Sequence, residues 1–165
     1  MGCGGGITFS LDIHRSAAQW DNTAVDPTSL FPLLRELYAE AQAYRESRGI
    51  HAAALADGGK LLIVTEDVGR HNAIDKVCGE AMLRGIPTTG KVLLATGRIS
   101  SEMLRKGAHM GTPIVVSRTS ATTLSIDLAK RLGLTLIGYV RGNSFYVYSH
   151  PERLLVSRPT PVLSQ

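Results

Sequence analysis

The chain has 165 residues, of which 44% are hydrophobic and 19% charged, and it carries a formal net charge of +4. This length and composition are typical of one soluble globular domain with a buried core, and they exclude an intrinsically disordered chain. No apolar run approaches the roughly 20 residues that a membrane helix needs, and the N-terminus lacks the pattern of a secretion signal. We therefore expect a cytoplasmic protein that does not enter a membrane.

The positive charge favours anionic partners, but the 18 lysines and arginines are spread along the chain without a dense run. Nucleic acid is therefore not expected as a partner. The only cysteines are Cys3 and Cys78, so the sequence offers neither a disulfide framework nor a CxxC metal pair. We expect no bound metal ion.

The first predicted elements are a loop rich in glycine and a leading strand, which together occupy residues 1–14. Asp26 and Pro27 then form an N-cap and first-turn pair, which predicts a helix to about residue 48. Its apolar stripe recurs at helical spacing and comprises Leu30, Leu33, Leu34, Leu37, Ala41 and Tyr44. Two apolar runs follow, at 50–56 and 61–65, and the glycines between them favour a tight hairpin turn.

Helices and strands alternate along the rest of the chain. The predicted helices are 72–84, 101–109 and 121–132, and the predicted strands are 92–96, 114–117, 134–140 and 145–148. This alternation predicts an α/β fold of three layers, in which helices cover both faces of a mixed, mostly parallel sheet. We assign residues 15–156 to a single α/β cofactor-binding domain and 157–165 to a flexible tail.

A polar cluster that contains an arginine follows each of three predicted strands, at 66–71, 97–102 and 117–120. If these strands are parallel, all three clusters lie along the edge of the sheet where open α/β folds bind ligands. Helix N-termini at this edge favour phosphates. Arg70, Arg98 and Arg118 would add charge-assisted contacts to such a ligand.

Each cluster also has a plainer interpretation. Ser100 and Ser120 stand where N-caps belong, and Arg98 and Arg118 are also consistent with surface ion pairs. A lone histidine such as His71 is more often a hydrogen bonder at a helix start than a catalyst. The segment 65–76 is harder to explain as a solvated helix start, because it crowds together the side chains of Asp67, Arg70, His71, Asn72, Asp75 and Lys76.

The two cysteines differ in their surroundings. Cys78 belongs to a helical stripe that we expect to pack against the sheet, formed by Ile74, Val77, Cys78, Ala81 and Met82. Cys3 lies among glycines, where it is either a reactive, exposed thiol or a fortuitous terminal cysteine. Zinc deaminase chemistry is disfavoured, because His71 is not followed by the H-x-E pattern and no PCxxC is present.

Four segments occur in an order that resembles the formate dehydrogenase accessory proteins, the FdhD family. They are VTEDVGRHNAIDK at 64–76, GRISSEM at 97–103, PIVVSRTSAT at 113–122 and LIGYVRGNSFYVYSHPERL at 136–154. The resemblance implies a core related to the cytidine deaminases, without their zinc site. It also implies a sulfurtransferase that acts as a sulfur carrier. A cysteine desulfurase loads a persulfide onto an essential cysteine, and the sulfur passes to a molybdenum bis(molybdopterin guanine dinucleotide) cofactor, which is then inserted into formate dehydrogenase.

Cys3 is the residue that best matches the persulfide cysteine of this family, although CGGG carries one cysteine where many members have two. The family's cofactor-binding stretch matches Tyr139, Val140, Arg141, Gly142, Asn143 and Ser144. The remaining candidate cofactor-binding residues lie in the junctions: Asp67, Gly69, Arg70, His71, Asn72, Arg98, Ser100, Ser101 and Arg118. GDP is the expected analogue of the cofactor.

The resemblance covers nearly the whole chain but not the N-terminal region of the family, so we expect a C-terminal portion that includes the cysteine loop. A homodimer is the expected assembly. One alternative is a non-catalytic chaperone that binds the molybdenum cofactor and whose cysteine is dispensable. A nucleotide-modifying hydrolase on a deaminase-like core is the other.

Overall fold

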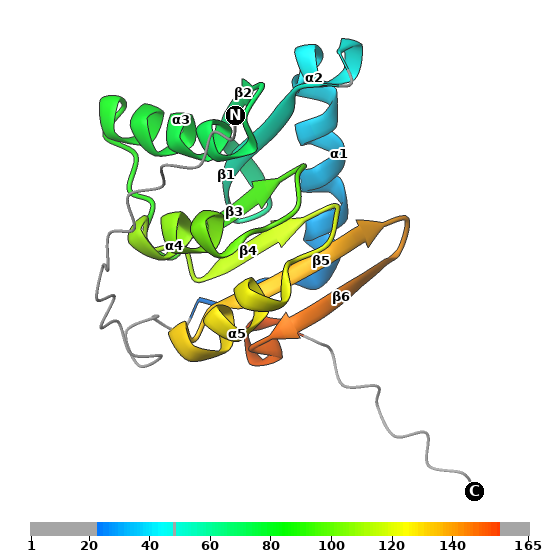
Figure 1. The fold of residues 1–165 in the computed structure, drawn as a ribbon, viewed down its shortest axis with the longest axis vertical. Helices are drawn as coiled ribbons and strands as arrows, with labels where there is room; N and C mark the ends of the chain where they lie inside the picture. The colour runs from blue at the N-terminus through cyan, green and yellow to red at the C-terminus, as the bar shows by residue number, and fades with distance from the viewer. Residues whose placement is uncertain (1–22, 48, 156–165) are drawn as a thin grey trace, which may run out of the picture.

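The computed structural model describes residues 23–47 and 49–155, which form a six-stranded sheet with helices on both faces (Figure 1). The strands are β1 (His51–Asp57), β2 (Lys60–Asp67), β3 (Val92–Ala95), β4 (Ile114–Ser117), β5 (Thr135–Arg141) and β6 (Ser144–Ser149). The predictions for residues 1–22, which include the leading strand and Cys3, lie outside the described residues. The same holds for the predicted tail.

The strand order is β2-β1-β3-β4-β5-β6. Pairs β3–β4 and β4–β5 are parallel, whereas β1 runs antiparallel to both β2 and β3, and β6 runs antiparallel to β5. Strands β2, β3, β4 and β5 therefore all point the same way, and only β1 and β6 are reversed. This arrangement confirms the predicted mixed sheet, in which four strands run in one direction although three of the five neighbouring pairs are antiparallel.

The helices divide between the two faces of the sheet (Figure 1). One face carries a short 3₁₀ turn η2 (Pro27–Ser29), α1 (Leu30–Glu40) and α2 (Gln42–Glu46). The other face carries α3 (Arg70–Leu83), α4 (Ser101–His109) and α5 (Thr123–Leu132), and a second 3₁₀ turn, η3 (Pro151–Arg153), follows β6. The predicted three-layer architecture is therefore confirmed.

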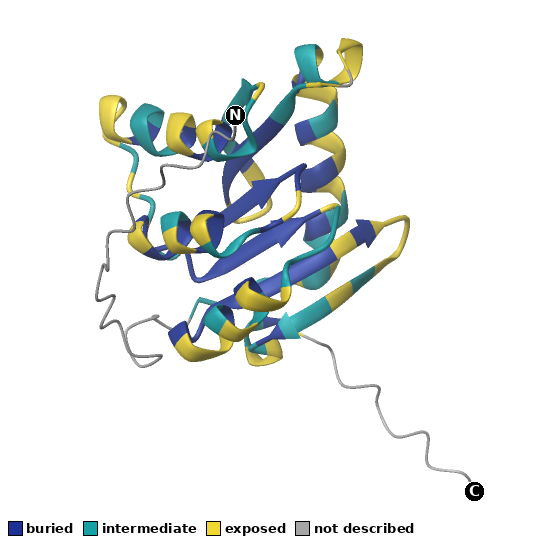
Figure 2. Ribbon diagram, in the orientation of Figure 1, coloured by how far each residue is buried: buried dark blue, intermediate teal, exposed yellow. Residues whose placement is uncertain are grey.

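Each face of the sheet has its own apolar core, and successive residues of a strand contribute to opposite cores. The central strands β3 and β4 are buried along their whole length (Figure 2). In β3, Leu93 packs toward α3, α4 and α5, whereas Leu94 packs toward α1. Both side chains are fully buried, as are Ile74 on α3 and Leu37 on α1. Because full burial of such a side chain contributes about 1.5–3 kcal/mol, the two cores hold the helices firmly against the strands whose ends carry the polar junctions.

The long helix predicted from Asp26 to about residue 48 is interrupted at Ala41, whose backbone leaves the helical region at ψ 78°. The side chain of Glu66 at the end of β2 explains the break. Its carboxylate accepts hydrogen bonds from the backbone N–H of Tyr44 at 2.6 Å and of Ala43 at 3.3 Å. These are free donors of a helix start, so the carboxylate stabilises a second helix, α2, at this point.

Two further predictions are wrong in detail. Met82 was expected to face the sheet but is 78% exposed, because it lies one position past Ala81 and the helix turns it away by about 100°. Ser120 was expected to cap a helix, but α5 begins at Thr123 and Thr122 is its N-cap, accepting a hydrogen bond from the backbone N–H of Ser125. The carbonyl of Ser120 instead accepts a hydrogen bond from Ile99.

Candidate functional site

The three polar junctions lie along one edge of the sheet, because β2, β3 and β4 all end there. Hydrogen bonds join the second junction to the third: Ile99 N donates to Ser120 O and Thr122 N donates to Ile99 O, both at 3.0 Å. The hairpin between β5 and β6 meets the same edge, where Tyr139 N donates to Thr119 O at 3.0 Å. The predicted meeting of these segments is therefore confirmed.

A pocket of about 430 Å³ opens at this edge on the side of the sheet that carries α1. Its lining comprises Phe31, Leu34, Arg35, Tyr38, Arg118, Val140, Arg141 and Gly142. The sequence pointed to Arg118, which follows β4, and to the three lining residues at the end of β5, but it missed the four from α1. The sequence contains a weak signal for two of these α1 residues. Arg35 and Tyr38 each follow a leucine of the apolar stripe and are three positions apart, so both lie on the same side of the helix, next to that stripe.

Positive charge in this pocket is not neutralised within residues 23–47 and 49–155. Arg35, Arg118 and Arg141 form no ion pair with a carboxylate there. Three lysines elsewhere are paired with carboxylates, for example Lys91 with Asp57 at 2.7 Å. The pocket therefore presents free guanidinium groups beside apolar side chains, which suits a ligand with anionic and planar aromatic parts.

Tyr38 and Arg118 are the central pair of the pocket. The Arg118 guanidinium carbon lies 4.7 Å from the centroid of the Tyr38 ring, within the range of a cation–π contact. Burial raises the pKa of Tyr38 to about 12, and its hydroxyl oxygen is buried without a hydrogen-bond partner among the described residues. The contact with Tyr38 also raises the pKa of Arg118.

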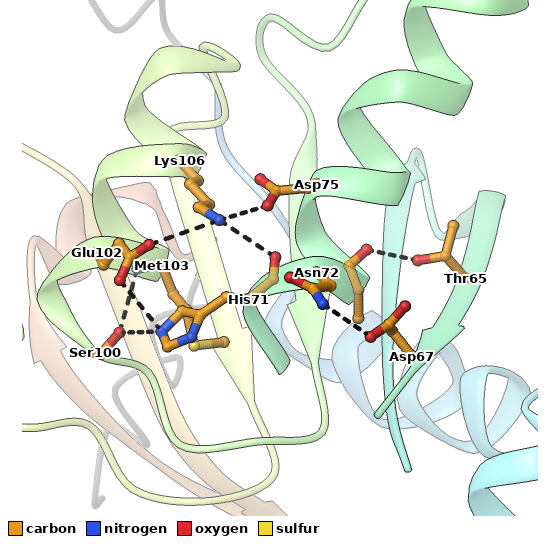
Figure 3. Close-up of polar contacts among 10 residues, drawn as sticks. Thr65, Asp67, His71, Asn72, Asp75, Ser100, Glu102, Met103 and Lys106 are labelled. Atoms are coloured by element: carbon orange, nitrogen blue, oxygen red, sulfur yellow. Dashed lines mark hydrogen bonds and ion pairs between the residues drawn. The ribbon is translucent and has the colours of Figure 1, made fainter. Parts of the chain in front are cut away.

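A second group of predicted residues lies on the opposite face, where α3 and α4 begin (Figure 3). Nε2 of His71 is 3.0 Å from Oγ of Ser100, and Ser100 caps α4 by accepting a hydrogen bond from Met103 N at 3.3 Å. Glu102 lies 3.8 Å from the same histidine nitrogen. The predicted capping role of Ser100 is confirmed. His71 makes a hydrogen bond with the Ser100 hydroxyl, as expected of a histidine at the start of a helix.

Much of the polar density in the segment 65–76 is explained by local structure. Asp67 accepts hydrogen bonds from Gly69 N at 2.9 Å and from the Asn72 amide at 3.1 Å, and it pairs with Lys76 at 2.7 Å. These three donors, with Lys76 first, lower the pKa of Asp67 to about 2. Asp67 and Asn72 therefore fix the turn into α3, and a contact of either with a ligand stays a prediction.

The network extends from α3 to α4 through one lysine. Lys106 pairs with Asp75 at 2.6 Å and with Glu102 at 3.8 Å, and it also donates to the carbonyl of His71 at 3.4 Å (Figure 3). Asp75 is thus engaged in holding the two helix starts together. Asp75 and Lys76 both belong to the crowded polar segment 65–76, and each forms an ion pair within the fold, Asp75 with Lys106 and Lys76 with Asp67.

His51 also lies at this edge of the sheet. It begins β1 and stands opposite Asp67 in the hairpin register. Its Nδ1 atom and the Nε atom of Arg70 are both buried, and neither has a hydrogen-bond partner in the part of the chain that the structure describes. Burial, and then the neighbouring charges of Arg70 and His71, lower the pKa of His51. No local motif marks His51, because only the pairing of β1 with its neighbours brings it here.

Four other predicted residues line neither the pocket nor the contacts just described. Arg98 is exposed and Ser101 half-buried, whereas Asn143 in the turn between β5 and β6 and Ser144 at the start of β6 are both exposed. Cys78 is half-buried against the core on the face with α3, as its stripe predicted. Among the described residues, no helix is long and apolar enough to cross a bilayer, and no three His, Cys, Asp or Glu side chains are grouped to hold a metal ion.

An open mixed sheet with unpaired arginines at its strand ends is the arrangement of α/β proteins that bind anionic ligands at that edge. The chain belongs to the FdhD/NarQ family, whose model matches residues 1–155. This match confirms the family resemblance that the four ordered segments indicated.

Curated relatives agree with the family assignment. The sulfur carrier protein FdhD of Bacillus subtilis (strain 168) is 38% identical over 154 residues, which cover 92% of this chain and 59% of that protein. The protein of the same name from Staphylococcus aureus (strain MRSA252) is 37% identical over 149 residues, which cover 90% of this chain and 56% of the relative. The chain thus spans somewhat more than half the length of these relatives.

One solved structure of a related protein agrees with this fold. A putative formate dehydrogenase accessory protein from Desulfotalea psychrophila is similar, with a TM-score of 0.74 and 38% identity over 80% of this chain and 57% of that chain. A dCMP deaminase from the cyanophage S-TIM5 has a TM-score of 0.48 and 14% identity, with coverage of 65% of this chain and 97% of that chain. The second likeness is too low to inform the chemistry of this chain.

Proposed function

We propose that this chain is the cofactor-binding part of a sulfur carrier protein that serves formate dehydrogenase. The family and the names of its relatives support the sulfur-carrier role. The structural observation that carries the proposal is the pocket on the α1 face, where Arg35, Arg118 and Arg141 are unpaired within the described residues. It lies beside the hairpin that matches the family's cofactor-binding stretch.

The proposed substrate is a molybdenum bis(molybdopterin guanine dinucleotide) cofactor, which accepts the sulfur. Its diphosphate groups would be bound by the arginines, whose planar donor groups match phosphate oxygens. Phe31, Leu34 and Val140 offer an apolar surface to a purine ring in the same pocket. GDP carries both features and is therefore the natural probe.

The sulfur chemistry is assigned to Cys3, which lies outside the described residues. The Cys3 thiolate would attack the outer sulfur of a desulfurase persulfide, so that a new S–S bond forms at Cys3 and the desulfurase cysteine leaves as a thiolate. This exchange needs no external oxidant, because one persulfide is consumed as the other forms. In this proposal the pocket binds the cofactor that accepts the sulfur, and the outer persulfide sulfur on Cys3 approaches the bound cofactor.

Two measurements on one set of purified variants test the proposal. GDP should bind the unmodified chain, and Arg35→Ala or Arg141→Ala should weaken that binding about tenfold or more, since a charge-assisted contact is lost. Arg105→Ala, which removes an exposed charge from α4 on the other face, should leave GDP binding unchanged. Equal affinity in all four proteins would show that the pocket is not the site.

Mass spectrometry tests the sulfur-carrier half of the proposal. A persulfide donor should add about 32 Da to the protein, and the adduct should map to Cys3. Cys78→Ser should still take up the sulfur, whereas Cys3→Ser should not. An adduct confined to Cys78 would favour a cofactor-binding chaperone that carries no sulfur. The same conclusion would follow if the protein bound GDP normally but took up no sulfur.

A further inference from the structure

Three basic side chains gather on the face of the sheet opposite the pocket, where β1 and α3 begin. They are His51, Arg70 and His71, which we call the His51 cluster. His51 lies on the same side of β1 as Ala53 and Leu55, whose side chains belong to the core beneath α3, α4 and α5. The sheet therefore separates the His51 cluster from the pocket beside α1.

Gly97, the second residue after β3, lets two members of the cluster approach each other. A Cβ atom on Gly97 would lie 3.1 Å from Nδ1 of His51 and 3.2 Å from Cβ and Cδ of Arg70. The carbonyl of Gly97 accepts a hydrogen bond from the Ser117 hydroxyl at 2.8 Å, which holds the glycine in place. His51 and Arg70 thus pack against one glycine, although they come from different elements.

Two nitrogen atoms of the cluster lack a hydrogen-bond partner among the described residues. They are Nδ1 of His51 and Nε of Arg70, and both are buried. A buried polar atom left unpaired costs about 1–3 kcal/mol, so a ligand atom that pairs with it is favoured. Because both nitrogens are shielded from solvent, a small group can reach them after a slight shift, whereas a nucleotide cannot.

Positive charge in the cluster exceeds the negative charge around it. Neither His51 nor Arg70 forms an ion pair within residues 23–47 and 49–155. Glu102 lies 3.8 Å from Nε2 of His71, but it is 64% exposed and lies equally close to Lys106 (Figure 3). Burial, and then the charges of Arg70 and His71, lower the pKa of His51. An anion among the three side chains would relieve this repulsion.

We propose that the His51 cluster binds one small sulfur anion, held by the imidazoles of His51 and His71 and by the guanidinium group of Arg70. The choice of sulfur rests on the proposed function. The site itself rests on the three clustered side chains and on the two buried nitrogens without partners. Cationic side chains of these kinds stabilise sulfur anions in proteins.

Two sources supply an anion of this chemistry. One is a free sulfur anion from solution, and the other is the deprotonated outer sulfur of a persulfide on Cys3. About 20 residues separate Cys3 from Thr23, where the described chain begins, and they can span up to about 70 Å when extended. The length of the chain therefore permits Cys3 to reach the cluster.

Thiocyanate is a suitable probe, because it is a small sulfur-bearing anion that does not load a thiol with sulfur. NMR spectra of the Cys3→Ser protein are recorded during a thiocyanate titration, with sodium fluoride keeping the ionic strength constant. The ring resonances of His51 and His71 should shift until they saturate, and the pKa of both should rise, because the anion favours the charged imidazole. His109, exposed at the end of α4, is the internal control and should not respond.

Substitutions of arginine test whether the cluster is responsible. Arg70→Gln should weaken thiocyanate binding about tenfold or more, since a charge-assisted contact is lost. Arg70→Lys keeps the charge without the planar donor group and should give an intermediate affinity. Arg105→Gln, an exposed position on α4, should bind as the parent does. Equal affinity in all four proteins, shifts of equal size at His109, or no saturable shift would overturn the inference.

Loading Cys3 with sulfur distinguishes the two sources. If the chain's own persulfide occupies the cluster, loading should shift the His51 and His71 resonances, and thiocyanate should no longer move them. If thiocyanate binds the loaded and unloaded proteins alike, the cluster takes a free anion.

The 32 Da adduct and GDP affinity, measured on the same samples, separate this inference from the proposed function. Normal adduct and GDP binding, with His51 and His71 silent toward both thiocyanate and loading, would overturn the inference alone. Thiocyanate binding without any adduct on Cys3 would keep the anion site and overturn the sulfur-carrier role.

Discussion

His51 and Arg70 each bury a nitrogen atom that has no hydrogen-bond partner within the described residues. A buried donor or acceptor left without a hydrogen bond costs about 1–3 kcal/mol of folding free energy. Two such atoms at one edge of the sheet therefore lower the stability of the fold there. They lie beside the His71–Ser100 contact, at the edge where the polar junctions meet. Such a cost is commonly found at functional sites, where a ligand or bound water supplies the missing partner.

The titration of His51 gives a prediction at the residue scale. Burial, Arg70 and His71 hold the pKa of His51 below its ordinary value of 6.5. The unfolded chain therefore takes up this proton at a higher pH than the folded chain, and the free energy of unfolding should decrease as the pH falls below 6.5. Once the pH is below the pKa of His51 in the folded protein, this contribution to the free energy of unfolding should be lost completely.

NMR titration of the imidazole measures this shift directly. The pKa of His51 should lie below 6.5 and should rise in Arg70→Gln, while staying depressed because burial is its main cause. His51→Phe should flatten the fall in unfolding free energy between pH 6.5 and 5. A pKa at or above 6.5 in the unmodified protein would contradict the burial described here.

Tight contacts between loops at the sheet edge determine how the elements meet. A Cβ atom on Gly138 in β5 would lie 2.9 Å from the carbonyl of Thr119 and 2.7 Å from the Tyr148 ring. The carbonyl cannot easily withdraw, since it accepts the hydrogen bond of Tyr139 N. Gly138 therefore permits the third junction and the β5–β6 hairpin to pack together.

A pair of glycine substitutions tests this at the element scale. Gly138→Ala should destabilise the protein by about 1–3 kcal/mol, the usual cost of overpacking, and should displace the hairpin that carries Arg141. Gly79→Ala in α3 should stabilise the protein by about 0.5–1 kcal/mol, because nothing lies within 4 Å of its added methyl group and alanine favours helix. Chemical denaturation compares the two variants, and similar effects in both would contradict the close contact at Gly138.

Over the whole molecule, the formal charge is +4, and ion pairs neutralise part of the positive charge. Lys76, Lys91 and Lys106 are paired with aspartates, whereas the three arginines that line the pocket on the α1 side have no carboxylate partner within residues 23–47 and 49–155. The pocket therefore gathers three positive charges that no carboxylate of the described residues neutralises. Such concentrated charge speeds and strengthens anion binding in a salt-dependent manner.

Salt dependence is the corresponding prediction. GDP affinity should decrease as sodium chloride rises from about 50 mM to about 500 mM, since screening lengths shorten below the size of the pocket. Arg35→Ala and Arg141→Ala should reduce the slope of this dependence, and Arg105→Ala should not. Affinity that is independent of salt would show that apolar contacts, not the arginines, dominate binding.

The sequence alone determined the order and type of most elements, because apolar spacing and turn residues are local signals. Helical spacing placed the buried face of α1 as far as Ala41, and the glycines after β1 marked its hairpin with β2. Ordered motifs also identified the family and singled out Arg118 and Arg141, which the pocket brings together.

Only the tertiary structure decided which of the polar residues meet one another. Glu66 breaks the first helix from across the fold, and this break places Tyr44 and Arg45 beside Tyr38. The register of β1 brings His51 to the edge. These contacts join residues distant in the chain, and a periodic pattern reports only which face of an element is buried. The particular neighbours that a polar side chain finds there depend on strand order and on how the helices pack.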